Sequence, residues 1–595
     1  MDMKIRQIIY IATIPALFAS CESAFENKAI GDFEESDVWR IPDIAEGTLL
    51  TAYDAIPSLF DSFNGNFLDV ATDNAVTNSF SSDVYKLSQA GVTAFNNPLG
   101  GWSNGYNQLQ TVNLFMERGL GQEVNYDKTS VENDTAIKKR LRGECHFLRA
   151  WWHFFLLQRY GGRTDDGQAL GIPLADHYIT NEEAADLSRF YRNTYRECVD
   201  FIVADLDSAA VLLPVNYSGS TTATGVTNIG RATALAAKVL KTRVVLYGAS
   251  PAYQPASVVQ INGIGDFTVT DAAAYEQNWK YVAAVADSVI QSSGFGNFTA
   301  LTAGLLADNT GNTPADFAFR SFGVNHTMET RHFPPMYYGS AQTQPSQNLV
   351  DAFPAKNGFP VTDPRSGYDS SDPYALARDN RFNMDIYYNG SKFGTNSGVI
   401  DITYGGKDSP SFDNNATRTG YYLAKFLSRK DNVLTPNSEL TTQHYTPILR
   451  KAEVFFNYAE ASNEAYGPKG IGEGCKMSAF DVMKAVRSAY GITDVTYLEE
   501  QAADKDSFRK LIANERRIEF AFENQRFFDL RRLLLPINTP VNGVSAVRTD
   551  GKVVYEYAEV EERPFNDVRF YYMPLPYSEL KKNSRMVNNM GWDNN

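Results

Sequence analysis

The sequence predicts an all-α frame of helix pairs that is interrupted by a loop-rich, irregular lobe. Before about residue 295 and again after about residue 445, apolar residues recur at alternating steps of three and four, which is the spacing of one face of an amphipathic helix. Between about 296 and 440 this period fades, and Gly, Asn, Asp, Pro and Tyr crowd together. That composition is typical of long loops with short strands.

The first part of the frame contains four predicted helices. In the earliest, residues 138–160, a single apolar stripe recurs along the segment, and Gly161 and Gly162 follow it as a stop signal. The other three predicted helices are residues 188–213, 231–247 and 278–291. Alanines in the helix at 231–247 allow close contact with a neighbouring helix.

After the lobe, helical periodicity returns at residues 449–466, 478–490 and 507–535. Within the lobe, residues 385–388 are expected to form one of the short strands. The last sixty residues are rich in Pro and Tyr and are predicted to be irregular. Helix pairs of this kind resemble tetratricopeptide repeats, although no strict period of about 34 residues is visible.

Composition restricts the classes of function. The chain has 595 residues and a net charge of −15, which argues against a nucleic-acid partner, since such a partner needs a basic surface. Aromatic residues make up 13% of the chain, as suits a protein that binds sugars. The four cysteines have no CxxC spacing, and the six histidines are scattered. We therefore expect no disulfide framework, no metal site and no cofactor.

The N-terminus carries an export signal. Lys4 and Arg6 precede an apolar run from residue 8 to residue 18, which is far shorter than the roughly 20 residues that span a membrane. Ala19 and Ser20 then lead into Cys21, and this pattern resembles the lipobox of bacterial lipoproteins. The resemblance implies cleavage before Cys21, lipidation of its sulfur, and attachment of the mature chain to a membrane outside the cytoplasm.

Five segments in order resemble motifs of the SusD/RagB family of outer-membrane lipoproteins. Each segment alone is weakly specific, but together they extend over most of the chain. They are residues 142–152 (RGECHFLRAWW), 230–251 (GRATALAAKVLKTRVVLYGASP), 448–461 (ILRKAEVFFNYAEA), 515–530 (ERRIEFAFENQRFFDL) and 573–580 (MPLPYSEL), with Gly591 and Trp592 near the end.

The resemblance implies a frame of tetratricopeptide-like helix pairs that carries a ligand-binding lobe. It also implies docking on a TonB-dependent outer-membrane barrel of the SusC type, and a location on the cell surface. We expect a signal peptide at 1–20, a lipidated tether at 21–42 and a SusD-like domain at 43–595. Within that domain the helical frame is 43–295 and 445–535, the ligand lobe is 296–444, and an irregular C-terminal cap is 536–595.

Candidate ligand-binding residues combine planar rings with polar groups. Trp102 follows a Gly pair at the predicted start of a helix, and Asp73 and Asn74 supply a carboxylate and an amide. In SusD-like proteins the sugar site lies on this N-terminal region and on the inserted lobe, so Trp102 is the preferred stacking platform. With Tyr106 four residues later, it can equally belong to a core stripe.

The lobe offers further candidates. Tyr337 and Tyr338 lie among Pro and Gly residues that suggest a rigid loop. Arg378 is suited to donate forked hydrogen bonds to hydroxyl groups, although its segment also resembles a structural turn of the family. We identify no catalytic set. Glu515, Glu519 and Glu523 fall four apart on one helix face, beside apolar residues and arginines, and they are interpreted as ion pairs between helices.

The sequence therefore predicts a surface lipoprotein that binds an oligosaccharide and delivers it to a partner barrel. One alternative within the family is a peptide ligand, for which charge and backbone pairing matter more than ring stacking. Another is a tetratricopeptide-type scaffold without a small ligand. An enzyme of glycan breakdown is the least favoured alternative.

Overall fold

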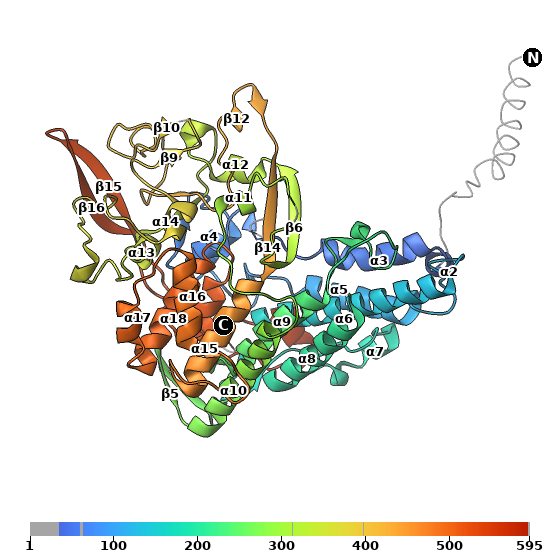
Figure 1. Cartoon of the computed structure of the whole chain (residues 1–595). Helices are drawn as coiled ribbons and strands as arrows, with labels where there is room; N and C mark the ends of the chain where they lie inside the picture. Colours follow the sequence, from blue (N-terminus) through green and yellow to red (C-terminus); the bar gives the residue numbers. More distant parts are fainter. Residues whose placement is uncertain (1–34, 60–62, 312, 397, 593–595) are drawn as a thin grey trace, which may run out of the picture.

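The computed structural model describes residues 35–59, 63–311, 313–396 and 398–592. In Figure 1 a row of helices on the right continues into a helical cluster at the lower left, and a loop-rich lobe stands above that cluster. The helices are α2 Glu35–Arg40, α3 Pro42–Asp54, α4 Asp83–Ser88, α5 Trp102–Leu114, α6 Val131–Tyr160, α7 Asn181–Ala185, α8 Tyr195–Leu212, α9 Ala234–Ala249, α10 Ala272–Ile290, α11 Ala303–Leu306, α12 Thr327–His332, α13 Gln347–Ala352, α14 Asn380–Asp385, α15 Lys451–Tyr466, α16 Ala479–Ala489, α17 Thr496–Gln501, α18 Lys505–Glu519, α19 Arg526–Arg532 and α20 Tyr577–Lys582.

Most of the described strands are short, and they form two-stranded antiparallel pairs. They are β1 Ala75–Thr77, β2 Gly162–Arg163, β3 Ala169–Leu170, β4 Val259–Gly263, β5 Asp266–Val269, β6 Phe317–Asn325, β7 Thr343–Pro345, β8 Ile386–Tyr387, β9 Lys392–Phe393, β10 Gly398–Val399, β11 Tyr422–Leu423, β12 Leu434–Thr435, β13 Ser438–Glu439, β14 Thr442–Arg450, β15 Val541–Thr549 and β16 Lys552–Glu561.

The helical frame is built by successive packing. Helix α5 contacts α6, α6 contacts α8, and the series continues through α9 and α10 to α15, which contacts α16 and α18. Each helix thus buries one face against the previous helix and another against the next, as helix-pair repeats do. The predicted all-α frame with an irregular lobe is confirmed.

Local sequence signals explain the ends of the frame helices. The side chain of Ser130 accepts a hydrogen bond from the backbone N–H of Asn133 and so caps α6, which ends before Gly161. Helix α8 begins with a capping box between Thr194 and Glu197, in which two otherwise unpaired N–H groups are satisfied. Helix α6 begins seven residues before the predicted start, because the first turns carry polar residues outside the apolar stripe.

The segment predicted as one helix over 507–535 is two helices. Helix α18 ends at Glu519 and α19 begins at Arg526, because Phe522 and Asn524 adopt positive φ angles of 60° and 58°, which a helix does not tolerate. The side-chain oxygen of Asn524 accepts a hydrogen bond from the backbone N–H of Leu68 at 2.7 Å. The break therefore connects the helical frame with the N-terminal segment.

The lobe is attached to the frame by β-structure longer than the sequence indicated. Strands β6 and β14 form an antiparallel ribbon of nine residues each, and β14 continues directly into α15, so residues 449 and 450 are strand rather than helix. Strand β1 pairs with β7. This pair fixes the N-terminal segment around Asp73 to the base of the inserted lobe.

The C-terminal cap is less irregular than predicted. Strands β15 and β16 form a hairpin whose two-residue connection is Asp550 and Gly551, with φ angles of 50° and 78°. An Asp-Gly pair with two positive φ angles is a favoured turn for a tight hairpin. Valines and tyrosines flank it, and the sequence analysis missed this signal.

The predicted tether also ends earlier than residue 42. Residues 35–40 form α2, in which Trp39 is buried and lies 6.4 Å from the ring of Phe115. Because this segment is mainly acidic and polar, the sequence analysis did not identify Trp39 as a core residue. Cys21 and the predicted signal peptide lie outside the described residues. In the described part of the chain, no helix is long and apolar enough to span a membrane.

Candidate functional site

The glutamates of α18 and its following loop belong to a buried ion-pair network. Glu515 contacts Arg381 at 2.6 Å and Arg487 at 2.8 Å. Glu519 contacts Arg450 at 2.5 Å, and Glu523 lies 2.8 Å from the same arginine. All of these side chains are buried. The predicted role in ion pairs is confirmed; the partners lie on α14, α16 and β14, and Glu523 also lines a small cavity.

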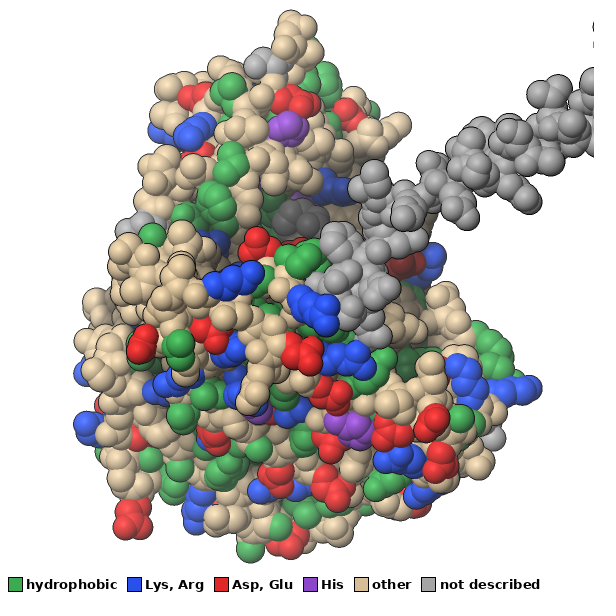
Figure 2. Space-filling model, turned by 90° about the vertical axis from the view of Figure 1, so that its right-hand side faces the viewer, with side chains coloured by type: hydrophobic (Ala, Val, Ile, Leu, Met, Phe, Trp, Pro, Cys, Tyr) green, Lys and Arg blue, Asp and Glu red, His purple; other side chains and the backbone are tan. Residues whose placement is uncertain are grey.

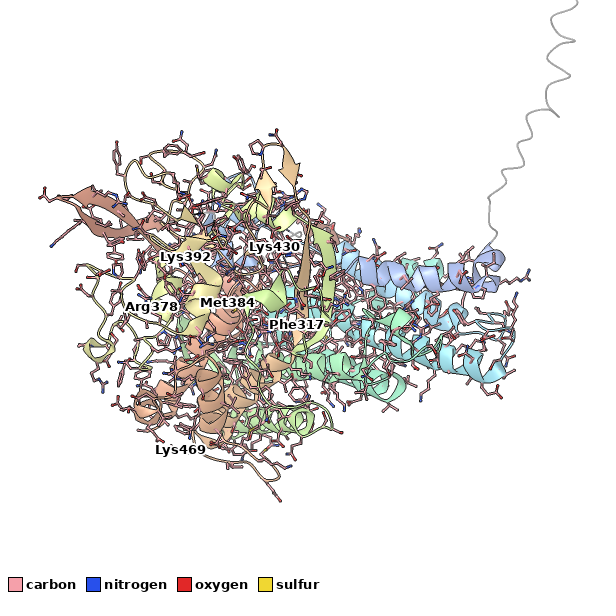
Figure 3. The ribbon with its side chains drawn as sticks, turned by 45° about the horizontal axis from the view of Figure 1, so that its top comes forward. Phe317, Arg378, Met384, Lys392, Lys430 and Lys469 are labelled. Atoms are coloured by element: carbon pink, nitrogen blue, oxygen red, sulfur yellow. The ribbon has the colours of Figure 1, made fainter. Side chains whose placement is uncertain are left out.

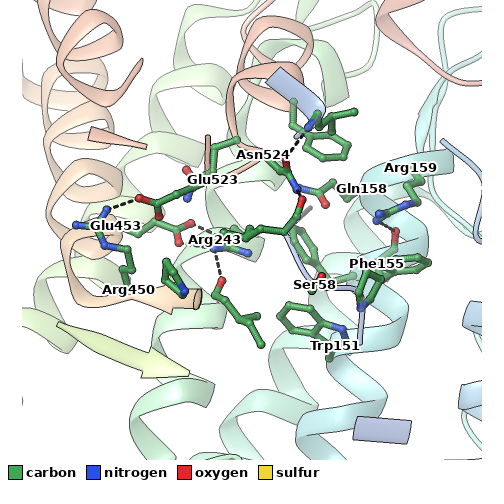
Figure 4. Close-up of a pocket in the computed structure, with 18 of the residues that line it drawn as sticks. Ser58, Trp151, Phe155, Gln158, Arg159, Arg243, Arg450, Glu453, Glu523 and Asn524 are labelled. Carbon is green, nitrogen blue, oxygen red and sulfur yellow. Dashed lines mark hydrogen bonds and ion pairs between the residues drawn. The ribbon is translucent and has the colours of Figure 1, made fainter. Parts of the chain in front are cut away.

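A small cavity lies where the lobe meets the frame. Figure 2 shows that this face is hollowed between the upper, loop-rich part and the lower, helical part, and Figure 4 shows the polar residues that line the cavity. Its volume is about 120 Å³, enough for a few water molecules. Arg243 contacts Glu453 at 2.5 Å. Because most of its charged groups pair with one another, whereas Arg159 packs on the ring of Phe155, we interpret this cavity as a structural joint.

Asp73 and Asn74 have partners within the protein. The carboxylate of Asp73 lies 3.0 Å from both Arg517 and Arg526. Burial alone would raise the pKa of Asp73, but the two guanidinium groups lower it well below its usual range. Asn74 donates to Asp69 at 2.9 Å and accepts from Arg517 at 2.7 Å. Both side chains thus stabilise the attachment of the N-terminal segment to α18.

Arg378 is also engaged internally. Its Nη1 donates to the carbonyl oxygen of Val350 at 2.8 Å, and its guanidinium lies 5.0 Å from the rings of Tyr368 and Phe382. The side chain is buried. Figure 3 shows Arg378 on the segment before α14. These contacts suit the structural-turn alternative raised by its sequence.

Trp102 lies at the start of α5 and is half-buried. Its ring packs 4.9 Å from that of Tyr106 and 5.0 Å from that of Tyr160. One side faces a cavity of about 300 Å³ that Phe190 and residues of α20 also line. Trp102 is therefore both packed on the frame and accessible. Its neighbours belong to the frame and the C-terminal segment, whereas the predicted tyrosines belong to the lobe.

The sequence predicted ligand binding by both Tyr337 and Tyr338, but the two side chains have different environments in the structure. Tyr337 stacks on Phe393 with ring centres 3.8 Å apart, and its hydroxyl accepts from the Lys407 ammonium at 3.0 Å. Tyr338 follows with a left-handed φ of 65°, and 55% of the residue is exposed. Tyr337 supports the loop and Tyr338 presents a ring.

Further exposed rings lie near Tyr338. The side-chain amide of Asn78 donates to the carbonyl oxygens of Ser340, at 2.7 Å, and Asn415, at 3.3 Å. Phe80 and Tyr338 are each two residues from this crossing, and Phe412 is three residues away, so their Cα atoms lie within about 7 to 11 Å of it. Phe80 is 53% and Phe412 is 63% exposed.

A second hydrogen bond adds a fourth ring. The backbone N–H of Gly405 donates to the hydroxyl of Ser411 at 2.7 Å, and Tyr404, which is 77% exposed, lies beside Gly405. We call Phe80, Tyr338, Tyr404 and Phe412 the aromatic surface. Exposed Ser340 lies two residues after Tyr338, and exposed Asn414 and Asn415 lie two and three residues after Phe412. The surface thus offers ring faces beside amide and hydroxyl groups.

Sequence reasoning found only Tyr338 of these four residues. Phe80, Tyr404 and Phe412 lie in turns among Ser, Gly and Asn, where an aromatic side chain is unlikely to enter a core. The sequence therefore contained a local indication that these three rings are exposed. It did not indicate that they lie close together, because their proximity depends on contacts between segments more than 250 positions apart.

A row of packed helix pairs that carries exposed rings and amides on an irregular lobe defines a ligand-binding protein of the helical-repeat class. Within the described residues, no three His, Cys, Asp or Glu side chains gather as metal ligands would. Known proteins agree with this class. A profile described as the SusD family matches residues 306–592, and one described as starch-binding and associating with the outer membrane matches residues 50–240.

The chain belongs to the SusD/RagB family. Over 174 residues it is 31% identical to SusD-like protein P2 of Formosa agariphila, a match that spans 29% of this chain and 30% of that protein. Its structure resembles that of a SusD-like protein from Bacteroides fragilis, with 24% identity, a TM-score of 0.71 and coverage of 94% and 99% of the two chains.

Two other solved structures share the fold. One is a SusD-like carbohydrate binding protein of Bacteroides fragilis, at 21% identity and a TM-score of 0.65, over 92% of this chain and 99% of that one. The other is a laminarin binding SusD-like protein, at 18% identity and a TM-score of 0.54, with the same coverage. Members of the family are thus described as binding proteins, and no catalytic family is indicated.

Proposed function

We propose that this protein captures an oligosaccharide outside the cell and delivers it to an outer-membrane transporter. The observation that carries the proposal is the aromatic surface, where three exposed rings lie within three residues of one crossing point and a fourth lies beside a neighbouring hydrogen bond. Isolated exposed rings are common on proteins, but a cluster of them marks a binding surface.

The chemistry of the surface favours a glycan. A sugar ring has an apolar C–H face that packs on an aromatic ring, and hydroxyl groups at its edge that need hydrogen-bond partners. Tyr404 and Phe412 supply rings, while the exposed amides of Asn414 and Asn415 supply donors and acceptors. The charged groups beside this surface include both signs, with Asp83 and Arg418 near Phe80 and Asp413 beside Phe412, so a neutral ligand suits it better than a highly charged one.

Capture implies a partner that transports the ligand. The partner proposed here is a TonB-dependent barrel of the SusC type, as the family resemblance implies. Lipidation of Cys21 would hold the protein at the outer membrane, with the described part of the chain exposed on the cell surface. The basis for this step is the lipobox-like sequence before Cys21 and the family profile described as associating with the outer membrane.

Two alternatives give different outcomes in the same assay. A peptide ligand would depend on backbone pairing and charge, so loss of single rings would change its affinity little. A scaffold without a small ligand would bind a barrel and no soluble glycan or peptide. Neither alternative accounts for four rings exposed together beside uncharged amides.

The test is calorimetric titration of the purified full chain with neutral plant, microbial and host oligosaccharides. Phe412→Ala and Tyr404→Ala should each weaken binding of the ligand at least tenfold while melting normally. Tyr281→Ala, at an exposed position of α10, is the matched control. Trp102→Ala distinguishes the aromatic surface from the cavity beside α20. Binding that survives both lobe variants would contradict the proposed site, and absence of any glycan ligand would contradict the proposed function.

A further inference from the structure

A third cavity lies in the helical frame, along one face of α18. Its volume is about 400 Å³, within the range of small-molecule sites. It is lined by Phe267 of β5, Tyr275 and Trp279 of α10, Asn463 of α15 and a face of α18, together with Arg526 at the start of α19. Neither the aromatic surface nor the joint between lobe and frame shares this space.

One face of α18 forms a wall of this cavity. The lining residues of the helix include Asp506, Arg509, Lys510, Ala513, Asn514 and Arg517, and these recur at steps of three and four, so they share a face. Asp506 and Lys510 are exposed, and therefore mark the end that opens to solvent. Arg517 lies seven residues further along, about 10 Å deeper on the helix axis.

The deep end carries more positive than negative charge. Arg517 and Arg526 both line the cavity, and both contact the single carboxylate of Asp73. Burial and the neighbouring Arg526 lower the pKa of Arg517 to about 10, so it remains charged at neutral pH. Asp69 and Asp351 are the next carboxylates, but burial raises the pKa of each.

Only part of each guanidinium group bonds Asp73 or Asn74, and the remainder is available to a ligand. The bonds of Arg517 to Asp73 and Asn74 use Nε and Nη2, and those of Arg526 to Asp73 use the same two atoms. By contrast, the carboxylates along the cavity are already paired with arginines of the protein. Glu464 contacts Arg509 at 2.5 Å, and Glu460 contacts Arg532 at 2.5 Å. A ligand oxyanion thus has two cations to approach.

The cavity also offers a buried acceptor. Asn463 is fully buried, and its Nδ2 donates to the carbonyl oxygen of Lys505 at 3.1 Å. Its Oδ1 has no hydrogen-bond partner within the described part of the chain. A buried carbonyl oxygen without a donor is costly, and a ligand hydroxyl group would satisfy it. Trp279, also buried, and Tyr275 add ring surface nearby.

We propose that this cavity is a second ligand site, specific for a sugar acid whose carboxylate contacts Arg517 and Arg526 and whose hydroxyl groups reach Asn463. The ring surface of Phe267 and Tyr275 suits the C–H face of such a ligand. The volume admits a small ligand, so the site takes either a free sugar acid or the end of an acidic oligosaccharide.

Calorimetry of the full chain with galacturonate, its linear trimer, glucose and sulfate tests the proposal. Galacturonate should bind, and glucose should not. Arg517→Gln removes the surplus charge but keeps a donor for Asn74, and should weaken binding at least tenfold. Ala513→Phe fills the cavity without touching an ion pair and should do the same. Binding of the trimer would identify a chain end as the ligand, and its failure to bind would identify the free acid.

Two controls separate this site from the rest of the protein. Arg196→Gln removes an exposed arginine of α8, and Phe412→Ala removes a ring of the aromatic surface; both should bind galacturonate as the parent does. The proposal is overturned if galacturonate does not bind at millimolar concentration, or if Ala513→Phe binds it unchanged. Sulfate or glucose binding as tightly as galacturonate would overturn the assignment to a sugar acid.

Discussion

Asn78 and Ser340 are 262 positions apart, yet the side-chain amide of Asn78 donates to the carbonyl oxygen of Ser340 at 2.7 Å. The same amide reaches the carbonyl oxygen of Asn415, so one side chain connects three segments. Each of the segments carries an exposed ring within three residues of the contact. The aromatic surface therefore depends on a polar contact that no single segment reveals.

Asn78→Ala should lower the affinity for the glycan more than it lowers stability. A hydrogen bond of this kind contributes about 0.5–1.5 kcal/mol to folding, but its loss lets the loops of Tyr338 and Phe412 move relative to Phe80. Calorimetry and thermal melting on the same sample measure the two effects. Asn538→Ala, which removes another exposed amide, is the control. Equal affinity in Asn78→Ala and the parent would show that Asn78 does not organise the surface.

Tyr338→Gly should weaken glycan binding without loss of stability. The backbone of Tyr338 has a φ of 65°, a conformation that costs roughly 1–2 kcal/mol for most residues and almost nothing for glycine. Tyr338→Ala keeps this cost, so it should unfold at lower denaturant concentration than Tyr338→Gly. Both variants lack the ring and should bind the glycan more weakly than the parent. A glycine variant that binds normally would exclude Tyr338 from the ligand contact.

The frame could be predicted because its signals are local. An apolar stripe and a following Gly pair define α6 within its own sequence, and the charge pattern of Glu515, Glu519 and Glu523 indicated ion pairs before their partners were known. The aromatic surface could not be predicted in full, because the positions of its rings relative to one another depend on the pairing of β1 with β7 and on the Asn78 contacts. Burial of Asp73 likewise depends on α18, more than 400 positions away.

Arg381→Met should destabilise the protein by about 3–5 kcal/mol. Arg381 is buried and contacts Asp379, Glu515 and Glu519. Its removal leaves Asp379 without a counter-charge and each glutamate with one arginine fewer, in a medium that solvates carboxylates poorly. Arg196→Met, which breaks the exposed pair with Asp200, should cost no more than about 1 kcal/mol. Denaturant titration measures both. Similar small losses for the two variants would mean that water reaches the network.

Asp385 lies beside this network without a partner of its own. It is fully buried, and neither carboxylate oxygen has a hydrogen-bond partner within the described residues. Burial raises the pKa of Asp385 to about 7; Lys425 lowers the pKa, and Glu519 and Glu523 raise it further. The neutral acid is therefore the form that the folded protein accommodates.

Asp385→Asn should stabilise the protein at pH 8 and give little gain near pH 4. Since the folded-state pKa lies above the unfolded value, the contribution of Asp385 is fully present below the unfolded pKa near 3.8 and is lost as pH rises to about 7. Asparagine mimics the neutral acid at every pH, and the pKa difference sets an upper limit of roughly 4 kcal/mol on the gain. Denaturant titrations at pH 4 and pH 8 measure it, with the exposed Asp200→Asn as control because water already solvates that carboxylate. A gain independent of pH would show that Asp385 is ionised in the folded protein throughout this range.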